Sequence, residues 1–198
     1  MAIKALIFDI DGVLADSRQA VVQNTLSLMH EFFISVDEEK VRGMSSAHSA
    51  ETVLVALAPS LADDRALLKR MLARLSQITV DNIALVRPTL LAESLPQLSA
   101  KYSLACATNR KSSAAAVLES LGIAGYFRAV LTSQHAPHKP DPTMVRMALA
   151  GLGVDAAEAL FVGDNEEDRQ AGLAAGVQFA MVDGTDEAAC RALLSRLL

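Results

Sequence analysis

The chain is 198 residues long, a length that suits one domain or one domain with an insertion. Hydrophobic residues make up 52% of it and charged residues 21%, so it can bury a sizeable core and is unlike a disordered protein. Its formal net charge is -5, and no run of Lys and Arg is longer than two, which argues against nucleic-acid binding. A small anionic ligand is not excluded, because it needs only a local positive site.

The first predicted strand is the apolar run Ile3–Phe8, which ends at Asp9. This run is too short for a signal-peptide core or for the roughly 20 apolar residues of a membrane span. We therefore expect a cytoplasmic protein, a monomer or weak dimer, with neither a membrane nor a nucleic-acid partner.

Two carboxylates follow this strand, Asp9 and Asp11, and Gly12 allows a tight turn after them. An ionised aspartate can attack phosphorus and form an acyl phosphate that water later opens. A second carboxyl group can donate a proton to the leaving oxygen and then take one from the attacking water. The same Asp-x-Asp-Gly spacing also occurs in calcium loops and in plain turns, so the spacing by itself leaves these alternatives open.

From Ser17 to Pro88 the pattern is helical and contains no convincing strand. Apolar residues at helical spacing predict two longer helices that flank a shorter helix around Ala50–Leu57, and Ser17 is placed as the N-cap of the first. We interpret residues 17–87 as a helical domain inserted into an α/β domain. That α/β domain then comprises residues 1–16 and 88–198.

Further short apolar runs predict buried strands, and the segments between the later runs have helical periodicity. Strands that alternate with helices indicate a Rossmann-like parallel sheet covered on both faces. In such a sheet, polar residues at the carboxyl ends of the strands converge on one site. The later predicted strands are Ser103–Ala107, Arg128–Leu131, Leu160–Val162 and Val177–Val182.

Asp164 follows one of these strands, where it can lie beside Asp9. Two like charges held together favour a divalent cation with hard oxygen ligands, which fits Mg²⁺. Glu166 and Glu167 fit better as the acidic start of a helix, where they complement the helix dipole. The sequence therefore predicts a Mg²⁺ site that includes Asp9 and Asp164.

Two other segments offer groups that a phosphoryl group needs. Thr108 and Asn109 follow a predicted strand and supply a hydroxyl, an amide and backbone N–H groups. Lys139 lies in a proline-rich segment and supplies an ammonium, although a solvated surface lysine is the alternative interpretation. Together with the carboxylates, these groups provide the positioning and charge neutralisation on which phosphoryl transfer depends.

In combination, these segments resemble the four motifs of the haloacid dehalogenase superfamily of phosphatases, in the same order and over nearly the whole chain. The helical insertion looks like the α-helical cap of the phosphoglycolate phosphatase and β-phosphoglucomutase branch, and Val41–Met44 resembles the cap loop of that branch. The segments that match the motifs are Asp9–Ser17, Thr108–Asn109, Lys139–Pro142 and Gly163–Asp164 with Asp168.

The resemblance implies a Mg²⁺-dependent phosphatase that hydrolyses a small phosphorylated metabolite, of the phosphoglycolate or sugar phosphate type, through an aspartyl-phosphate intermediate. It implies that Asp9 is the nucleophile and Asp11 the general acid/base. Asp9, Asp164 and the backbone carbonyl of Asp11 are implied as metal ligands. Asp168 is implied as a nearby acid outside the direct ligands.

The same resemblance implies that Thr108, Asn109 and Lys139 bind the substrate phosphate. In the cap, Arg42 is the residue that we expect to contact a substrate anion, since a cap that closes over a site can select substrates and exclude water. The weaker candidates for substrate contact are His48, His135 and His138.

Departures from the family pattern bear on the reaction. Dehalogenase-type members lack the second aspartate, so Asp11 favours a phosphatase or a mutase. Val21 stands where β-phosphoglucomutases have a cap histidine, and His30 lies further along the helix, which argues against mutase activity. A mutase of the β-phosphoglucomutase type and a non-catalytic phosphometabolite-binding regulator remain as alternatives. A phosphorylated receiver domain also combines paired acids, a threonine and a lysine with a metal. It has no helical insertion of this size after its first strand, which argues against this class of protein.

Overall fold

The computed structural model describes residues 2–44 and 49–198, and these residues divide into two compact units. The core unit combines the chain up to Asp16 with Arg87–Leu198, and the helical unit is Ser17–Val86. Each unit has its own cluster of buried apolar side chains. The chain is therefore an α/β protein with a small helical domain inserted after its first strand, the predicted fold class.

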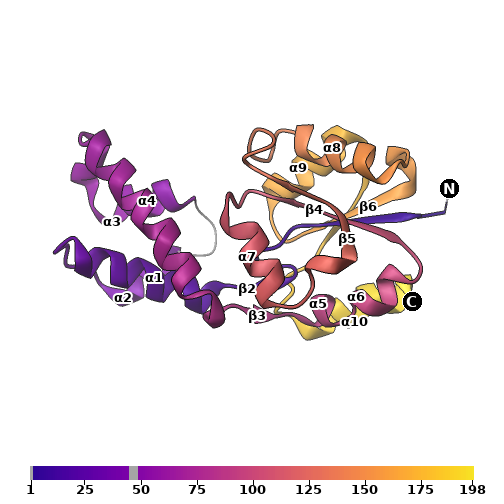
Figure 1. The fold of residues 1–198 in the computed structure, drawn as a ribbon, viewed down its shortest axis with the longest axis horizontal. Coiled ribbons are helices and arrows are strands. Elements are labelled where there is room, and N and C mark those ends of the chain that lie inside the picture. Colours follow the sequence, from indigo (N-terminus) through magenta and orange to yellow (C-terminus); the bar gives the residue numbers. More distant parts are fainter. Residues whose placement is uncertain (1, 45–48) are drawn as a thin grey trace. The chain divides into compact units, whose positions relative to one another are not determined.

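In the described part of the chain, five parallel strands form the sheet of the core unit, in the order β5-β4-β1-β6-β7 (Figure 1). β1 is central, and its register places Ile7 between Ala105 of β4 and Phe161 of β6. All four residues of β1 are buried, which explains its uninterrupted apolar sequence. The strands are Ala5–Phe8 (β1), Ser103–Thr108 (β4), Phe127–Thr132 (β5), Ala159–Gly163 (β6) and Gln178–Met181 (β7).

The direction of chain progression across the sheet changes between β1 and β6. β4 and β5 extend the sheet on one side of β1, whereas β6 and β7 extend it on the other. Open parallel sheets bind ligands outside the carboxyl ends of their strands at such a point. Asp9 and Asp164 directly follow these two strands, and the Asp9 N–H donates to the Val162 carbonyl at 3.0 Å. The topology therefore places the predicted acids side by side.

Helices cover both faces of this sheet (Figure 1). α8 and α9 lie on one face, where Met144 and Val145 of α8 pack into the core cluster, and α5, α6 and α10 lie on the other. The helices of the core unit are α5 (Leu90–Glu93), α6 (Leu95–Ser99), α7 (Ser113–Ser120), α8 (Thr143–Leu152), α9 (Glu166–Ala175) and α10 (Glu187–Leu197), with short 3₁₀ helices at Ala124–Tyr126 and Ala156–Glu158.

The helical unit packs around buried side chains that include Leu28, Met29, Leu54 and Met71. Its helices are α1 (Arg18–Glu31), α2 (Glu38–Met44), α3 (Ala50–Leu57) and α4 (Arg65–Asp81), with 3₁₀ helices at Pro59–Ala62 and Ile83–Leu85. The two longer helices and the shorter α3 were predicted. α2 was not, because only Val41 is buried in it and it therefore lacks apolar periodicity. Among residues 2–44 and 49–198, no helix is long and apolar enough to cross a membrane.

Two short strands lie where the chain leaves the core unit and where it returns. β2 (Ala15–Asp16) pairs antiparallel with β3 (Arg87–Pro88), so the prediction that the segment up to Pro88 contains no strand is wrong at its last residues. The Thr89 hydroxyl donates to the Val13 carbonyl at 2.6 Å beside this pair. A two-residue strand is too short to produce an alternating pattern, which is why the sequence did not indicate it. Ser17 occupies the N-cap position of α1 as predicted, although its side chain accepts no capping hydrogen bond.

The backbone is strained at Phe33, just after the end of α1. Phe33 has a φ of 56° and is 97% exposed, at the position after the helix where glycine is preferred. Its N–H donates to the His30 carbonyl, and the next N–H, of Ile34, donates to the Met29 carbonyl, as in a Schellman motif. We predict that Phe33→Gly raises the free energy of unfolding by about 0.5–1 kcal/mol, since it removes the left-handed strain and loses little packing.

Chemical denaturation measures this change, with Phe33→Ala as the control. Alanine keeps the strained φ, so its free energy of unfolding should stay within about 0.5 kcal/mol of the parent protein. Equal stability of the glycine and alanine variants would contradict the strain at Phe33.

Candidate active site

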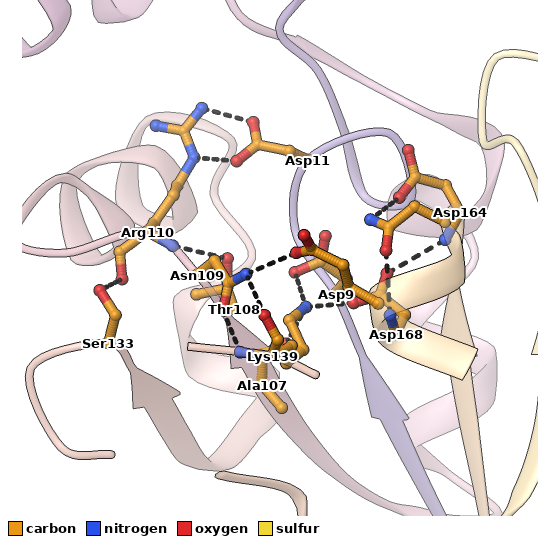
Figure 2. Close-up of polar contacts among 12 residues, drawn as sticks. Asp9, Asp11, Ala107, Thr108, Asn109, Arg110, Ser133, Lys139, Asp164 and Asp168 are labelled. Carbon is orange, nitrogen blue, oxygen red and sulfur yellow. Dashed lines mark hydrogen bonds and ion pairs between the residues drawn. The ribbon is translucent and has the colours of Figure 1, made fainter. Parts of the chain in front are cut away.

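The candidate active site lies at the carboxyl ends of the neighbouring strands β4, β1 and β6 (Figure 2). Asp9 directly follows β1, Thr108 is the last residue of β4, and Asp164 directly follows β6. Lys139 reaches the same place from the loop between β5 and α8. The structure therefore brings together residues that the sequence predicted to meet because of their positions at strand ends.

The side chain of Lys139 lies at the centre of this group, with only 2% of its surface exposed. Its ammonium donates to Asp9 Oδ1 at 2.8 Å and to the Ala107 carbonyl oxygen at 2.9 Å, and it pairs with Asp168 Oδ1 at 2.5 Å. The hydrogen bonds to Asp9 and Ala107 use two of the three N–H donors of the ammonium, and the ion pair with Asp168 surrounds it with a second carboxylate. The alternative interpretation of Lys139 as a solvated surface lysine is therefore wrong.

Burial and mutual repulsion perturb the protonation of these groups. Burial raises the pKa of Asp9 from 3.8 to about 6; the Lys139 ammonium limits this shift, and the charges of Asp168 and Asp11 add to it. Burial, followed by the charge of Asp9, raises the pKa of Asp164 to about 6. For Lys139, burial lowers the pKa, but the Asp9 and Asp168 carboxylates outweigh burial and raise it above its ordinary value. The group of Asp9, Asp164 and Lys139 in the folded chain therefore favours the binding of a cation or of a proton.

Three carboxylates in the described part of the chain form a group that can hold a metal ion. Asp9, Asp164 and Asp168 each offer one oxygen, and these oxygens lie within 4.8 Å of one another. Partly buried carboxylate oxygens suit Mg²⁺. Asp168 is the least available, because its Oδ1 pairs with Lys139 and its Oδ2 accepts from the Asp164 N–H at 3.3 Å. The donor set therefore fits a Mg²⁺ held mainly by Asp9 and Asp164.

Two glycines allow the backbone to approach closely around this group. Gly12 has a φ of 72°, and a Cβ atom at this position would lie 1.9 Å from Asp164 Oδ2. The Gly184 N–H donates to the Gly12 carbonyl at 2.6 Å, and a Cβ atom on Gly184 would lie 2.2 Å from the Val13 carbonyl oxygen. Any other residue at either position would therefore move the loop that follows Asp9, which confirms the turn predicted at Gly12.

Asn109 contacts the backbone of Lys139 with both ends of its amide group. Its Oδ1 accepts from the Lys139 N–H at 2.8 Å, and its Nδ2 donates to the Lys139 carbonyl at 3.3 Å. The same Nδ2 lies 3.3 Å from Glu167 Oε2. The Asn109 side chain thus holds the lysine segment, and the contact with a substrate phosphate that the resemblance implies for it stays a prediction. Thr108 is buried, and its Oγ1 accepts from the Arg110 N–H at 3.3 Å.

Asp11 lies apart from the three-carboxylate group and pairs with Arg110 (Figure 2). The Arg110 Nε donates to Asp11 Oδ2 and Nη2 donates to Oδ1, both at 2.6 Å. Burial lowers the pKa of Arg110, but the charge of Asp11 and its hydrogen bonds raise it above its ordinary value. Sequence reasoning missed Arg110; the available signal was a cation that directly follows Thr108 and Asn109 in the chain.

The candidates of the helical unit stay predictions. Arg42 lies in α2, where its Nε donates to Glu38 Oε1 of the same helix at 3.1 Å. This i, i+4 pair is exposed, and such pairs add little to stability. His48 lies outside the described residues. No contact described here tests a role of Arg42 toward a substrate.

The two loop histidines of the core unit are exposed. His135 Nδ1 accepts from the Thr132 N–H at 3.1 Å and lies 3.0 Å from the Thr132 hydroxyl, so the ring supports the turn at the end of β5. The backbone carbonyl of His138 accepts from the Asp141 N–H at 3.1 Å in the turn that contains Lys139. The His138 contact involves only its backbone, so substrate contact by the side chains of His135 and His138 stays a prediction.

Comparisons with known proteins agree with this arrangement. Residues 6–182 match the family described as haloacid dehalogenase-like hydrolase. A phosphoglycolate phosphatase of Rhodospirillum rubrum is 34% identical over 186 residues, which cover 88% of this chain and 77% of that protein. An N-acetylmuramic acid 6-phosphate phosphatase of Pseudomonas aeruginosa is 29% identical over 192 residues, 92% of this chain and 82% of that protein.

A solved structure is similar over most of its length. It is a hydrolase of the haloacid dehalogenase superfamily, subfamily IA, from Geobacter sulfurreducens PCA, with a TM-score of 0.76 and 28% identity. The alignment covers 91% of this chain and 89% of that chain. The likeness therefore extends over both the sheet and the inserted helices.

The raised pKa of Asp164 predicts an effect on stability. Because the folded state holds the Asp164 proton more tightly than the unfolded state does, stability falls as the pH rises from about 4 to about 6, and the loss is complete above that pH. We predict that Asp164→Asn raises the free energy of unfolding by about 1 kcal/mol at about pH 8 in EDTA. This value is smaller than the full pKa shift suggests, because solvent screens a half-buried carboxylate.

Urea denaturation at about pH 8 and about pH 4 tests this effect, with Asp63→Asn, an exposed aspartate of the helical unit, as the control. At the lower pH the stabilisation by Asp164→Asn should disappear, because the carboxyl group is then largely neutral in the folded state. A destabilised variant at about pH 8, or an equal gain at both pH values, would refute the repulsion at Asp164.

Proposed function

Because this chain belongs to the haloacid dehalogenase-like hydrolase family, we propose that it is a Mg²⁺-dependent phosphatase that acts on a small phosphorylated metabolite. The observation that carries this proposal is the buried group at the end of β1. There, Asp9 faces Asp164 and Asp168 and is held by Lys139. A carboxylate fixed beside a cation and a possible metal site suits nucleophilic attack on a phosphoryl group.

In the proposed first step, an oxygen of Asp9 forms a bond to phosphorus while the bond from phosphorus to the substrate oxygen breaks. Asp11 donates a proton to that leaving oxygen. With a pKa of about 6, Asp9 is largely ionised at neutral pH and can attack. The Lys139 ammonium binds Oδ1 of Asp9. Oδ2 of Asp9 is not bound by this ammonium and can attack phosphorus.

In the proposed second step, water attacks the phosphorus of the aspartyl phosphate. The water gives a proton to Asp11, the bond between phosphorus and Asp9 breaks, and inorganic phosphate leaves. The proton that Asp11 lost in the first step is thereby restored, so the chain ends in the state in which it began.

Charge neutralisation comes from a cation of the chain and from the metal. Lys139 offsets the charge of Asp9 and Asp168, and its ammonium lies beside the oxygen of Asp9, where it would also face a bound phosphoryl group. When bound by Asp9, Asp164 and the Asp11 backbone carbonyl, Mg²⁺ would neutralise charge on the phosphoryl oxygens. Thr108 would offer its hydroxyl, and Asn109 would keep Lys139 in place.

The relatives guide the proposed substrate class. One similar protein is named for phosphoglycolate and another for N-acetylmuramic acid 6-phosphate, so we propose a substrate of the phosphoglycolate or sugar phosphate type. The mutase alternative gains no support, because Val21 stands at the place of the cap histidine. The regulator alternative explains neither the paired acids Asp9 and Asp11 nor the buried Lys139.

Phosphate release tests the proposed function. We predict that the purified protein releases phosphate from at least one compound in a panel of phosphoglycolate, sugar phosphates, nucleoside monophosphates and pyrophosphate with Mg²⁺, and that EDTA abolishes the release. Asp9→Asn removes the nucleophile and should lower the rate by at least about a thousandfold. Asp63→Asn, which changes an exposed aspartate of the helical unit, should retain the parent rate.

Two outcomes would contradict the proposal. Turnover that survives Asp9→Asn would exclude Asp9 as the nucleophile. Tight binding of a panel compound without any phosphate release would favour the non-catalytic regulator.

A further inference from the structure

The ion pair between Arg110 and Asp11 differs from the other arginine pairs of the described chain in its burial. The Arg110 side chain is 10% exposed, whereas the other paired arginine side chains are at least 40% exposed. Both Asp11 oxygens accept from the guanidinium at 2.6 Å in a forked arrangement. Such pairs are shorter and more directional than ordinary hydrogen bonds, so this pair restricts the orientation of Asp11.

Arg110 is itself held from several elements. Its N–H donates to Thr108 Oγ1 at the end of β4, and its Nη1 donates to Ser113 Oγ in α7, both at 3.3 Å. Its carbonyl accepts from the Ser133 N–H at 3.1 Å and from the Ser133 hydroxyl at 3.2 Å, just after β5. These hydrogen bonds hold both the backbone and the guanidinium of Arg110. Arg110 can therefore determine the position of a more exposed side chain that pairs with it.

Asp11 is that partner. Its side chain is 39% exposed, and it lies on the turn after β1 that Gly12 closes through a hydrogen bond to the Ala15 carbonyl at 2.9 Å. Figure 2 shows its carboxylate turned toward Arg110, whereas the carboxylates of Asp9 and Asp168 contact Lys139. Asp11 is thus paired with Arg110, whereas Asp9 and Asp168 are paired with Lys139.

We propose that Arg110 is the positioning residue of Asp11: it holds the carboxyl group in the orientation from which Asp11 transfers protons. This inference rests on the proposed function, in which Asp11 protonates the leaving oxygen. Both Asp11 oxygens accept from the guanidinium in the fork, so one of them has to leave Arg110 to carry the proton to the leaving group, while the other keeps its hydrogen bond and with it the orientation. Without the arginine, Asp11 would lose two short, directional hydrogen bonds, and its carboxyl group would be less restricted in orientation.

Two aryl phosphates that differ by one nitro group test the dependence of the reaction on a proton donor. p-Nitrophenolate leaves without a proton, whereas the phenolate of phenyl phosphate is a poorer leaving group and depends more on the acid. We predict that Arg110→Gln lowers kcat/KM for phenyl phosphate about 10- to 100-fold, and for p-nitrophenyl phosphate less than about 3-fold. Arg110→Lys, which keeps the charge but not the fork, should fall between Arg110→Gln and the parent protein.

A double-mutant cycle with Asp11→Asn then separates a positioning role from a structural one. If Arg110 acts through Asp11, Arg110→Gln should change the phenyl phosphate rate of the Asp11→Asn protein less than about 2-fold. Arg191→Gln, which removes an exposed pair with Glu187 on α10, is the matched control and should leave both rates at the parent level. Circular dichroism checks that each variant is folded.

The outcomes distinguish the two proposals. Equal losses for both aryl phosphates, or an undiminished loss in the Asp11→Asn protein, would overturn the role of Arg110 while the phosphatase activity stands. If the parent protein hydrolyses neither ester with Mg²⁺ and also fails on the metabolite panel, the proposed function and this inference fall together.

Discussion

A buried ammonium among carboxylates is the interaction on which the site depends. Lys139 contacts Asp9 and Asp168 directly, and Asp164 lies in the same group, so one positive charge faces three acids. Charges taken out of water are costly unless they are paired and hydrogen-bonded. Burial raises the pKa values of Asp9 and Asp164, and the single charge of Lys139 offsets this effect only in part. We therefore infer an affinity of the group for a further cation.

The strand order makes this arrangement possible. β1 and β6 are neighbours although their residues lie far apart in the chain, and their carboxyl ends place Asp9 beside Asp164. Two residues directly after β4 then complete the site: Asn109 holds the backbone of Lys139, and Arg110 pairs with Asp11. One edge of the sheet therefore holds two sets of ion pairs. The inner set suits the nucleophile and the metal, and the outer set suits proton transfer in the mechanism that we propose.

Much of this was predictable from the sequence, because buried parallel strands leave apolar runs that end in polar residues. The meeting of Asp9 with Asp164 and Lys139 followed from such runs and from the family resemblance. The short elements α2 and β3 were not predictable, since neither is long or apolar enough to produce a periodic pattern. Arg110 was missed for a different reason: its importance comes from an ion pair with a residue 99 positions away, and no local pattern encodes that contact.

The stability of the metal-free protein tests the dependence on Lys139 most directly. At about pH 8 in EDTA, we predict that Lys139→Met lowers the free energy of unfolding by about 3–5 kcal/mol, because it leaves buried carboxylates without their cation. Adding Asp168→Asn to this variant should restore at least half of the loss, since it removes the acid closest to the missing ammonium. A Lys139→Met protein as stable as the parent, or a double variant no more stable than the single one, would contradict the central role of this ammonium.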